Sequence, residues 1–265
     1  MRRLFFIIIT AGFSCSTYAE FRIWEDRKGN SLEAEYIKVI GESVNLRYPR
    51  KFNIAGFSDE DQVYIQLQNP PKLMINEVKR TGSQTTAYTK QSSIQVSGDN
   101  TTKLYSQVSI ERDDRRTYDQ SLTLKVYWIG HQTQHSENGG WSKEGRTILL
   151  KEVAEEIISP EQLVPNEPLT ISGGPVAFKR TLLLDVREVP KKLSGSDYIK
   201  VDRSYYYVSR RRVTHDEGLI YLLAVVVDQR NEVLAMAATE KKLMRYADLI
   251  MQAGIGDPLQ DLNEL

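Results

Sequence analysis

The sequence predicts a mainly β protein in which a small β-barrel is followed by a larger β-sandwich and a short C-terminal helix. Two short runs, Phe21–Trp24 and Leu32–Ile37, alternate apolar and polar residues as strands with one buried face do. The chain has 14 tyrosines and many valines, isoleucines and threonines, which favour strands. Because Pro70-Pro71 interrupts the pattern, we expect a domain boundary there.

Composition excludes several classes of partner. The 265 residues include 35 basic and 35 acidic ones, so no net charge would draw the chain to nucleic acid or to an anionic membrane. Cys15 is the single cysteine, which rules out a disulfide framework within the chain. We therefore expect a soluble protein that folds around its hydrophobic core alone and has no nucleic-acid partner.

Residues 1–19 predict a signal peptide. The pair Arg2-Arg3 is a positive start, and Leu4–Phe13 is an apolar run of signal-peptide length. Thr17 and Ala19 are small residues at the two positions that a signal peptidase reads, so we expect cleavage after Ala19. A membrane span needs about 20 apolar residues, so we expect no stable span after cleavage.

Two alternatives remain open for this segment. In the first, Cys15 is a lipid-attachment site, although the bulky Phe13 fits the required pattern poorly. In the second, the apolar run is an uncleaved anchor. All three readings take the chain out of the cytoplasm, so we expect a periplasmic or extracellular protein.

The first domain is expected over residues 20–68. Two more short runs, Val44–Tyr48 and Phe52–Ile54, complete a set of four predicted strands. Strands this short usually curl into a barrel, because a small open sheet leaves too many free edges. Ser58 is a good N-cap and three acidic residues follow it, so a helix is predicted over residues 59–67.

Residues 21–67 resemble SLA homology domain 1, an SH3-like module that occurs in many exported bacterial proteins. The likeness is carried by Arg22-Ile23-Trp24, Gly29, Leu32-Glu33-Ala34-Glu35-Tyr36, Val44-Asn45-Leu46 and Ser58-Asp59-Glu60-Asp61-Gln62-Val63-Tyr64-Ile65. The segment from Arg47 to Phe57 is about three residues shorter than usual for this module. The resemblance implies an SH3-like barrel and a peptide-binding role, without fixing which peptide is bound.

Trp24 and Tyr36 are the candidate binding residues of this module. Their aromatic rings suit a peptide groove. The alternative is that both rings pack in the core and rim of the barrel, because aromatic residues at strand spacing are mostly packing residues.

The second domain, residues 72–253, is predicted as a two-sheet sandwich. Its end is similar to an immunoglobulin-like domain of exported bacterial proteins. Thr239 starts a predicted helix that runs to Gln252, and residues 254–265 are expected to form a loose tail. Ten runs are predicted as strands: Leu73–Val78, Ser93–Val96, Lys103–Glu111, Ser121–Ile129, Arg146–Val153, Leu169–Ile171, Arg180–Val189, Ser204–Val213, Leu219–Asp228 and Glu232–Ala238.

No catalytic motif, phosphate-binding loop or dinucleotide-binding glycine pattern is present. His131 and His135 are four residues apart, but we expect them in a polar loop, and the glutamate of the helical zinc motif is missing. His215 is expected to be solvated at a turn. We therefore predict no metal, no cofactor and no enzymatic activity.

Tyrosines and arginines share one predicted strand in the second domain. Tyr205 and Tyr207 precede Arg210 and Arg212, and stacking together with guanidinium donors would suit an acidic glycan, a peptide or a protein partner. The alternative is an amphipathic strand whose charges keep an edge soluble.

The predicted function is an exported, non-enzymatic binding or scaffold protein that recognises a peptide or protein segment through its SH3-like module. A carbohydrate-binding or envelope-polymer-binding protein is the first alternative. A hydrolase with a site assembled only in three dimensions is the second.

Overall fold

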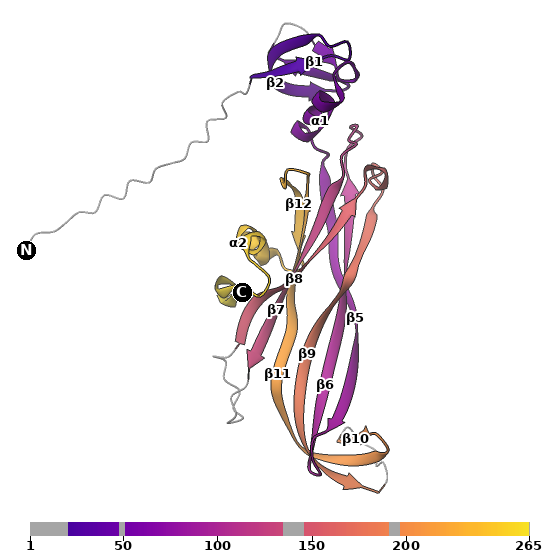
Figure 1. Ribbon diagram of the computed structural model, residues 1–265, viewed down its shortest axis with the longest axis vertical. Coiled ribbons are helices and arrows are strands. Elements are labelled where there is room, and N and C mark those ends of the chain that lie inside the picture. Colours follow the sequence, from indigo (N-terminus) through magenta and orange to yellow (C-terminus); the bar gives the residue numbers. More distant parts are fainter. Residues whose placement is uncertain (1–20, 48–50, 135–145, 191–196, 265) are drawn as a thin grey trace, which may run out of the picture. The chain divides into compact units, whose positions relative to one another are not determined.

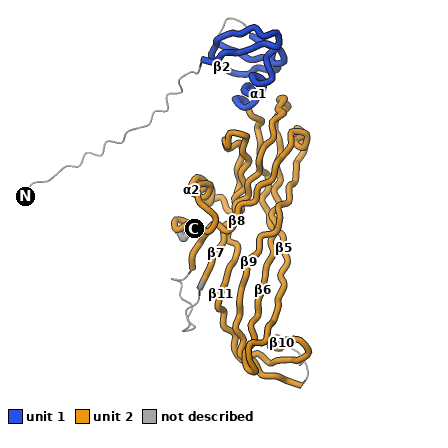
Figure 2. Tube along the Cα trace, viewed as in Figure 1, with its two compact units in different colours: residues 1–69 blue, residues 70–265 orange. Residues whose placement is uncertain are grey.

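The computed structural model describes residues 21–47, 51–134, 146–190 and 197–264. The chain divides into two compact units, residues 1–69 and 70–265 (Figure 2). Most described residues lie in strands, which confirms the mainly β class. The predicted signal peptide, with Cys15, and His135 lie outside the described residues.

The first unit contains a four-stranded antiparallel sheet in the order β1-β2-β3-β4. Its strands are β1 (Phe21–Glu25), β2 (Ser31–Ile40), β3 (Ser43–Leu46) and β4 (Lys51–Asn53). Gly29 and Gly41 stand at the first two turns with φ of 81° and 60°, a backbone conformation that suits glycine. The Asp26 carboxylate accepts hydrogen bonds from the Lys28 and Asn30 backbone N–H groups, which fixes the first turn.

The chain returns to β1 after β4. Asp26 forms an antiparallel bridge with Phe57, and the Ser58 N–H donates to the Glu25 carbonyl at 2.8 Å. Helix α1 (Asp59–Gln68) then begins, and the Ser58 hydroxyl caps it by accepting from the Asp61 N–H at 3.3 Å. The core under the helix consists of Trp24, Ala34, Val44, Leu46, Phe57 and Ile65.

The second unit is built on one hydrogen-bonded sheet in the order β5-β6-β9-β11-β7-β8, with β10 and β12 also paired to β11 (Figure 1). The strands are β5 (Leu73–Lys90), β6 (Gln95–Arg112), β7 (Leu122–Gln134), β8 (Arg146–Ile158), β9 (Leu169–Val189), β10 (Tyr198–Val201), β11 (Ser204–Val227) and β12 (Val233–Ala238).

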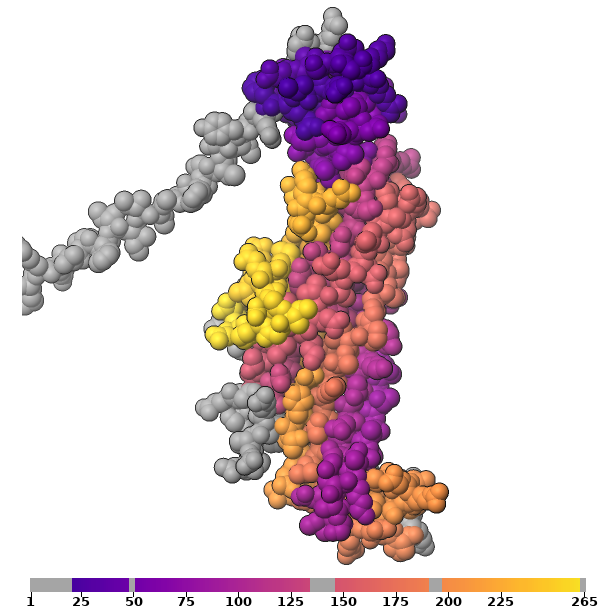
Figure 3. All heavy atoms as spheres, in the orientation of Figure 1, coloured from indigo at the N-terminus to yellow at the C-terminus, as the bar shows by residue number. Residues whose placement is uncertain are grey.

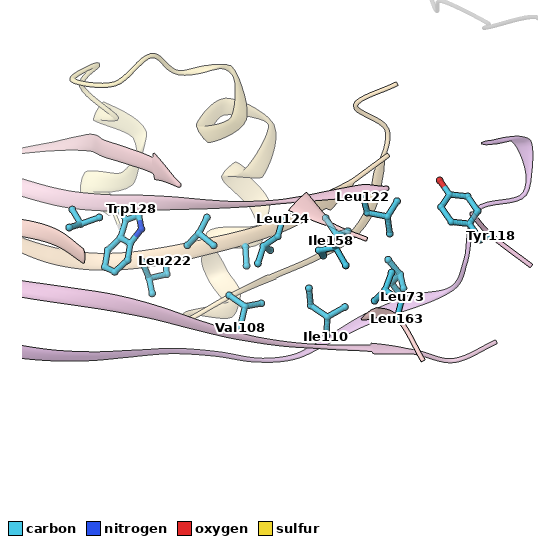
Figure 4. Packing of buried hydrophobic residues seen from close by; sticks show 14 of the residues in the cluster. Leu73, Val108, Ile110, Tyr118, Leu122, Leu124, Trp128, Ile158, Leu163 and Leu222 are labelled. Carbon is cyan, nitrogen blue, oxygen red and sulfur yellow. The ribbon is translucent and has the colours of Figure 1, made fainter. Parts of the chain in front are cut away.

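Strand β11 joins two layers of this sheet. One of its edges pairs with β9 as far as Asp216 and with β12 from Leu223 onward, so β9 leaves the edge between these points. Strands β5, β6 and β9 then face β12, β11, β7 and β8 across a shared core, where Val108 and Ile110 lie opposite Leu124 (Figure 4). The second unit therefore has two facing layers that belong to one continuous hydrogen-bonded sheet, where the sequence predicted two sheets.

The C-terminal segment covers the outer face of the β11 layer (Figure 3). It contains the 3-10 helix η4 (Lys241–Tyr246), helix α2 (Ala247–Gln252) and the 3-10 helix η5 (Gln260–Glu264). Leu222–Val227 in β11 are buried because this segment covers one face and the shared core the other. Among the described residues, no helix has the length and apolar character needed to cross a membrane.

The prediction of a loose tail from residue 254 is wrong for most of its length. Leu259 and Leu262 are buried, and the Leu259 N–H donates to the Ile148 carbonyl at 2.8 Å. The two leucines lie three residues apart, so a single 3-10 turn brings both onto one face. That face packs on β8.

Beyond the region where the two layers face each other, β5, β6, β9 and β11 continue as a single layer towards β10. Residues 79–87 of β5 are exposed throughout. A separate small core closes the far end, where β10 packs with residues of β6, β9 and β11: Val96, Leu184, Val186, Ile199, Val201, Tyr206 and Val208.

Candidate binding surfaces

Trp24 is a core residue of the first unit. Its side chain is 1% exposed, and its indole N–H donates to the Ala34 carbonyl at 2.8 Å. Its ring packs against Phe57 and Tyr64, with ring centroids 5.5 Å and 5.6 Å away. Of the two readings of Trp24, this placement favours packing over direct contact with a ligand.

Tyr36, Tyr64 and Arg22 form the Tyr36–Tyr64 surface beside Trp24. The two tyrosines are half-buried and meet edge to face, with centroids 6.3 Å apart. The Arg22 guanidinium lies 4.4 Å from the centroid of the Tyr64 ring, within cation–π range. Tyr36 is thus joined by two residues that were not among the binding residues predicted from the sequence.

Arg22 is held in place by Asp61, which is buried at the start of α1. The Asp61 carboxylate accepts from the Arg22 Nε at 2.9 Å and from the Glu25 backbone N–H at 2.6 Å. Asp61 therefore ties helix α1 to strand β1. Sequence reasoning assigned Asp61 only to the helix N-terminus, because a contact with β1 across 39 residues leaves no local pattern.

The outer face of β1 and β2 carries exposed apolar residues among acidic ones. Phe21 and Ile23 are 61% and 69% exposed. In the strand register they lie opposite Glu35 and Glu33. Glu35 pairs with Arg47 at 2.9 Å, whereas Glu33 forms no ion pair within the described residues.

The structure brings Tyr205, Tyr207, Arg210 and Arg212 onto one face of β11. A β-bulge between Val208 and Arg210 shifts the register, so all four residues lie opposite odd-numbered residues of β9. Opposite residues of an antiparallel pair share a face, and alternate residues of β9 share a face. We call this group the Tyr/Arg face; its partners on β9 are Val189, Arg187, Asp185 and Leu183.

The side chains of the Tyr/Arg face differ in whether they contact other side chains or are open to a ligand. Arg212 donates to Asp185 at 2.8 Å, and Tyr207 packs against Tyr198 with ring centroids 5.5 Å apart. Arg187 and Arg210 are exposed and form no ion pair with any residue that the structure describes. The face therefore offers two free guanidinium groups beside a tyrosine that is 37% exposed.

A second charged group lies where β9 leaves β11. Glu217 accepts from the Lys151 ammonium at 2.9 Å and from the Lys179 backbone N–H at 3.1 Å. Burial acts to raise the pKa of Glu217, but these donors more than offset it, so the pKa is lowered. The carboxylate thus bonds a β9 N–H at the point where β9 separates from β11.

His131 and His215 do not lie where the sequence placed them. His131 lies in β7 rather than in a loop, and it packs over Gly218. His215 lies within β11, at 3.2 Å from Glu217, rather than at a solvated turn. Burial and the nearby Arg146 lower the pKa of His131. Within the described ranges, no group of three His, Cys, Asp or Glu side chains is placed to hold a metal ion.

The described surfaces thus include an aromatic one in the first unit and a cationic–aromatic one in the second. Both have the side chains to contact a ligand through ring stacking and guanidinium hydrogen bonds. Comparisons of the chain with protein-family models, with curated proteins and with solved structures found no match.

Proposed function

We propose that this protein is an exported, non-enzymatic binding or scaffold component whose first unit is an SH3-like module that recognises a peptide or protein segment. The Tyr36–Tyr64 surface is the observation that supports this proposal most directly. The bridge between Asp26 and Phe57 also supports it, because it links the returning chain to β1 and so curls the sheet towards a barrel.

The Tyr36–Tyr64 surface has the chemistry of a peptide-binding surface. Tyrosine rings offer flat apolar area together with a hydroxyl group, and aromatic-lined grooves hold extended peptides in other small β modules. Asp61 fixes Arg22 before any ligand arrives. Little conformational entropy is then lost on binding, which favours affinity.

Export is supported by the pattern of residues 2–19, with its basic start, apolar run and small residues at Thr17 and Ala19. The expected compartment is periplasmic or extracellular. Mass spectrometry of the protein from fractionated source cells tests this, because cleavage after Ala19 gives an N-terminus at Glu20. Recovery of the full-length chain in the cytoplasmic fraction would contradict export.

Binding is tested by capture from the envelope fraction with the mature protein, followed by identification of cross-linked residues. We expect the cross-links to map to the first unit and to be lost in Tyr36→Ala and Tyr64→Ala. Tyr105→Ala is the matched control, because Tyr105 is 40% exposed and lies in the second unit. Capture that is unchanged in both first-unit variants would refute the proposal.

Binding of an acidic glycan is the second candidate function, and the Tyr/Arg face supports it. Free guanidinium groups beside an exposed tyrosine suit a carboxylated sugar, since arginine pairs with the carboxylate and the ring packs on the sugar. Titration with polygalacturonate is the test. We expect Arg210→Ala and Tyr207→Ala to weaken binding, whereas Arg203→Ala, also exposed, is the control.

A further inference from the structure

Strand β5 has an unpaired edge along part of its length. It is the last strand of the sheet, and β6 is its hydrogen-bonded neighbour. Near the hairpin end, the Gln91 N–H donates to the Gln95 carbonyl at 3.0 Å, so Gln91 faces β6. The register runs unshifted from Glu77 to Lys90. Hydrogen-bonding direction alternates along a strand, so the even-numbered residues of this stretch turn their N–H and C=O groups away from β6.

The open part of this edge covers residues 79–87. Before it, Ile75 and Val78 pack in the same core as Leu234 of β12. After it, Tyr88 packs with the small core that contains β10. Residues 79–87 themselves are exposed on both faces of the sheet. The outward-facing backbone groups are those of Arg80, Gly82, Gln84 and Thr86.

Proline and a β-bulge, two devices that usually protect a sheet edge, are missing from residues 79–87, and the stretch is long and extended. Its charged residues, Lys79 and Arg80, both stand at its start. The opposite edge strand, β8, is protected: the Leu150 N–H donates to the Asp257 carbonyl at 3.2 Å, and Glu152, Glu155 and Glu156 are exposed along it. The fold thus covers one edge and leaves the other available.

The charge around the open edge is positive. Arg80 and Lys103 form no ion pair within the described part of the chain, and Lys103 lies opposite Ser83. Glu77 pairs with Lys79 at 2.6 Å, and Asp99, which accepts from the Thr181 hydroxyl at 3.0 Å, lies opposite Ala87 at the far end of the stretch. A second copy of β5 would bring the same cations together, which disfavours self-pairing. The edge instead complements an acidic strand.

We propose that the β5 edge is a strand-addition site for an acidic, extended segment of a partner protein. The segment pairs with the outward N–H and C=O groups of Gly82, Gln84 and Thr86, and its carboxylates lie near Arg80 on one face of the sheet and near Lys103 on the other. Main-chain pairing supplies affinity, and the cations select acidic sequences. This site is separate from the Tyr36–Tyr64 surface.

The test uses the full chain and a fluorescent nine-residue peptide that repeats Thr-Glu-Glu, so that glutamates lie on both faces of the added strand. We expect saturable binding at least about tenfold tighter than that of the same peptide with lysine in place of glutamate. Hydrogen exchange should slow at the Gly82, Gln84 and Thr86 amides in the complex. The Ser83 and Thr85 amides face β6, so their exchange should not change.

Two variants separate strand addition from loose charge attraction. Gln84→Pro removes an outward N–H without removing a bond to β6, so it should abolish binding while the fold, followed by circular dichroism, is kept. Gln84→Thr is its matched control and should bind normally. Reversing both free cations, Arg80→Glu with Lys103→Glu, should weaken binding of the acidic peptide at least about fivefold and favour the lysine peptide.

Several results would overturn the proposal. They are the absence of saturable binding, equal binding of the two peptides, and normal binding by Gln84→Pro. Protection of the Gly82, Gln84 and Thr86 amides that rises with protein concentration, without peptide, would also overturn it, because a second copy would then occupy the edge.

Discussion

Replacing Asp61 by alanine should destabilise the first unit and leave the second unchanged. The substitution removes the acceptor of two donors, the Arg22 guanidinium and the Glu25 backbone N–H. Asp61 is 2% exposed, so water cannot readily replace the lost bonds. Both donors are then left without a partner, and one of them is charged.

The expected loss follows from those contacts. Removing one partner of a buried ion pair costs about 3–5 kcal/mol. The Arg22 side chain is 33% exposed, so part of its charge regains water and the lower value applies. We expect about 3 kcal/mol. A unit of this size has a free energy of unfolding of roughly 2–7 kcal/mol, so the loss is about two fifths of it or more.

Urea-dependent hydrogen exchange followed by mass spectrometry reads the two units separately. Asp59→Ala is the matched control on the same helix: the Asp59 side chain is 94% exposed, and its oxygen lies 3.6 Å from Arg27, so a change within about 0.5 kcal/mol is expected. The reasoning is refuted if the two variants destabilise the first unit equally.

Three further predictions concern the second unit. Burial lowers the pKa of His131, so as the pH falls the unfolded chain binds a proton at this histidine before the folded chain does. The stability that His131 contributes above about pH 6.5 is therefore lost below that pH. His131→Gln should flatten the pH dependence of the urea midpoint between about pH 5 and 7. In Gly218→Ala the new Cβ would lie 2.5 Å from the His131 ring, so we expect the free energy of unfolding to fall by about 1–3 kcal/mol. In a double-mutant cycle, most of this loss should disappear when His131→Ala removes the ring. Ile250 is fully buried on α2, so Ile250→Ala should lower the free energy of unfolding by about 2–5 kcal/mol, as thermal unfolding would measure. The neighbouring Leu249 is 36% exposed, and Leu249→Ala should lower it by less than about 1 kcal/mol. Equal losses would contradict docking of this helix through Ile250.

The sequence predicted strand content better than strand length. We expected a strand at Leu73–Val78, whereas β5 continues to Lys90. Residues 79–90 include four threonines and lack alternating apolar residues. Both faces of the sheet are exposed over residues 79–87, so no buried face imposes a period of two. Strand β6 was likewise expected as two runs, Ser93–Val96 and Lys103–Glu111, because residues 97–102 between them include no apolar side chain.

For the candidate surfaces, too, the sequence predicted the residue types but not their arrangement. The types of residue on the Tyr/Arg face were evident from the sequence. However, Tyr205 and Tyr207 differ in parity from Arg210 and Arg212, so a regular strand would place the two pairs on opposite faces. The bulge that brings them together depends on the register with β9, which no local pattern encodes.

Strand β11 has a consequence for how the second unit melts. Three separate hydrophobic cores usually suggest parts that can unfold one at a time. Here a single strand of 24 residues, β11, contributes to all three cores. Tyr206 and Val208 lie in the small core beside β10, Leu222 in the core between the two layers, and Leu223 in the core under the C-terminal segment. A break anywhere along β11 therefore loosens every core, and the second unit should unfold in a single calorimetric transition.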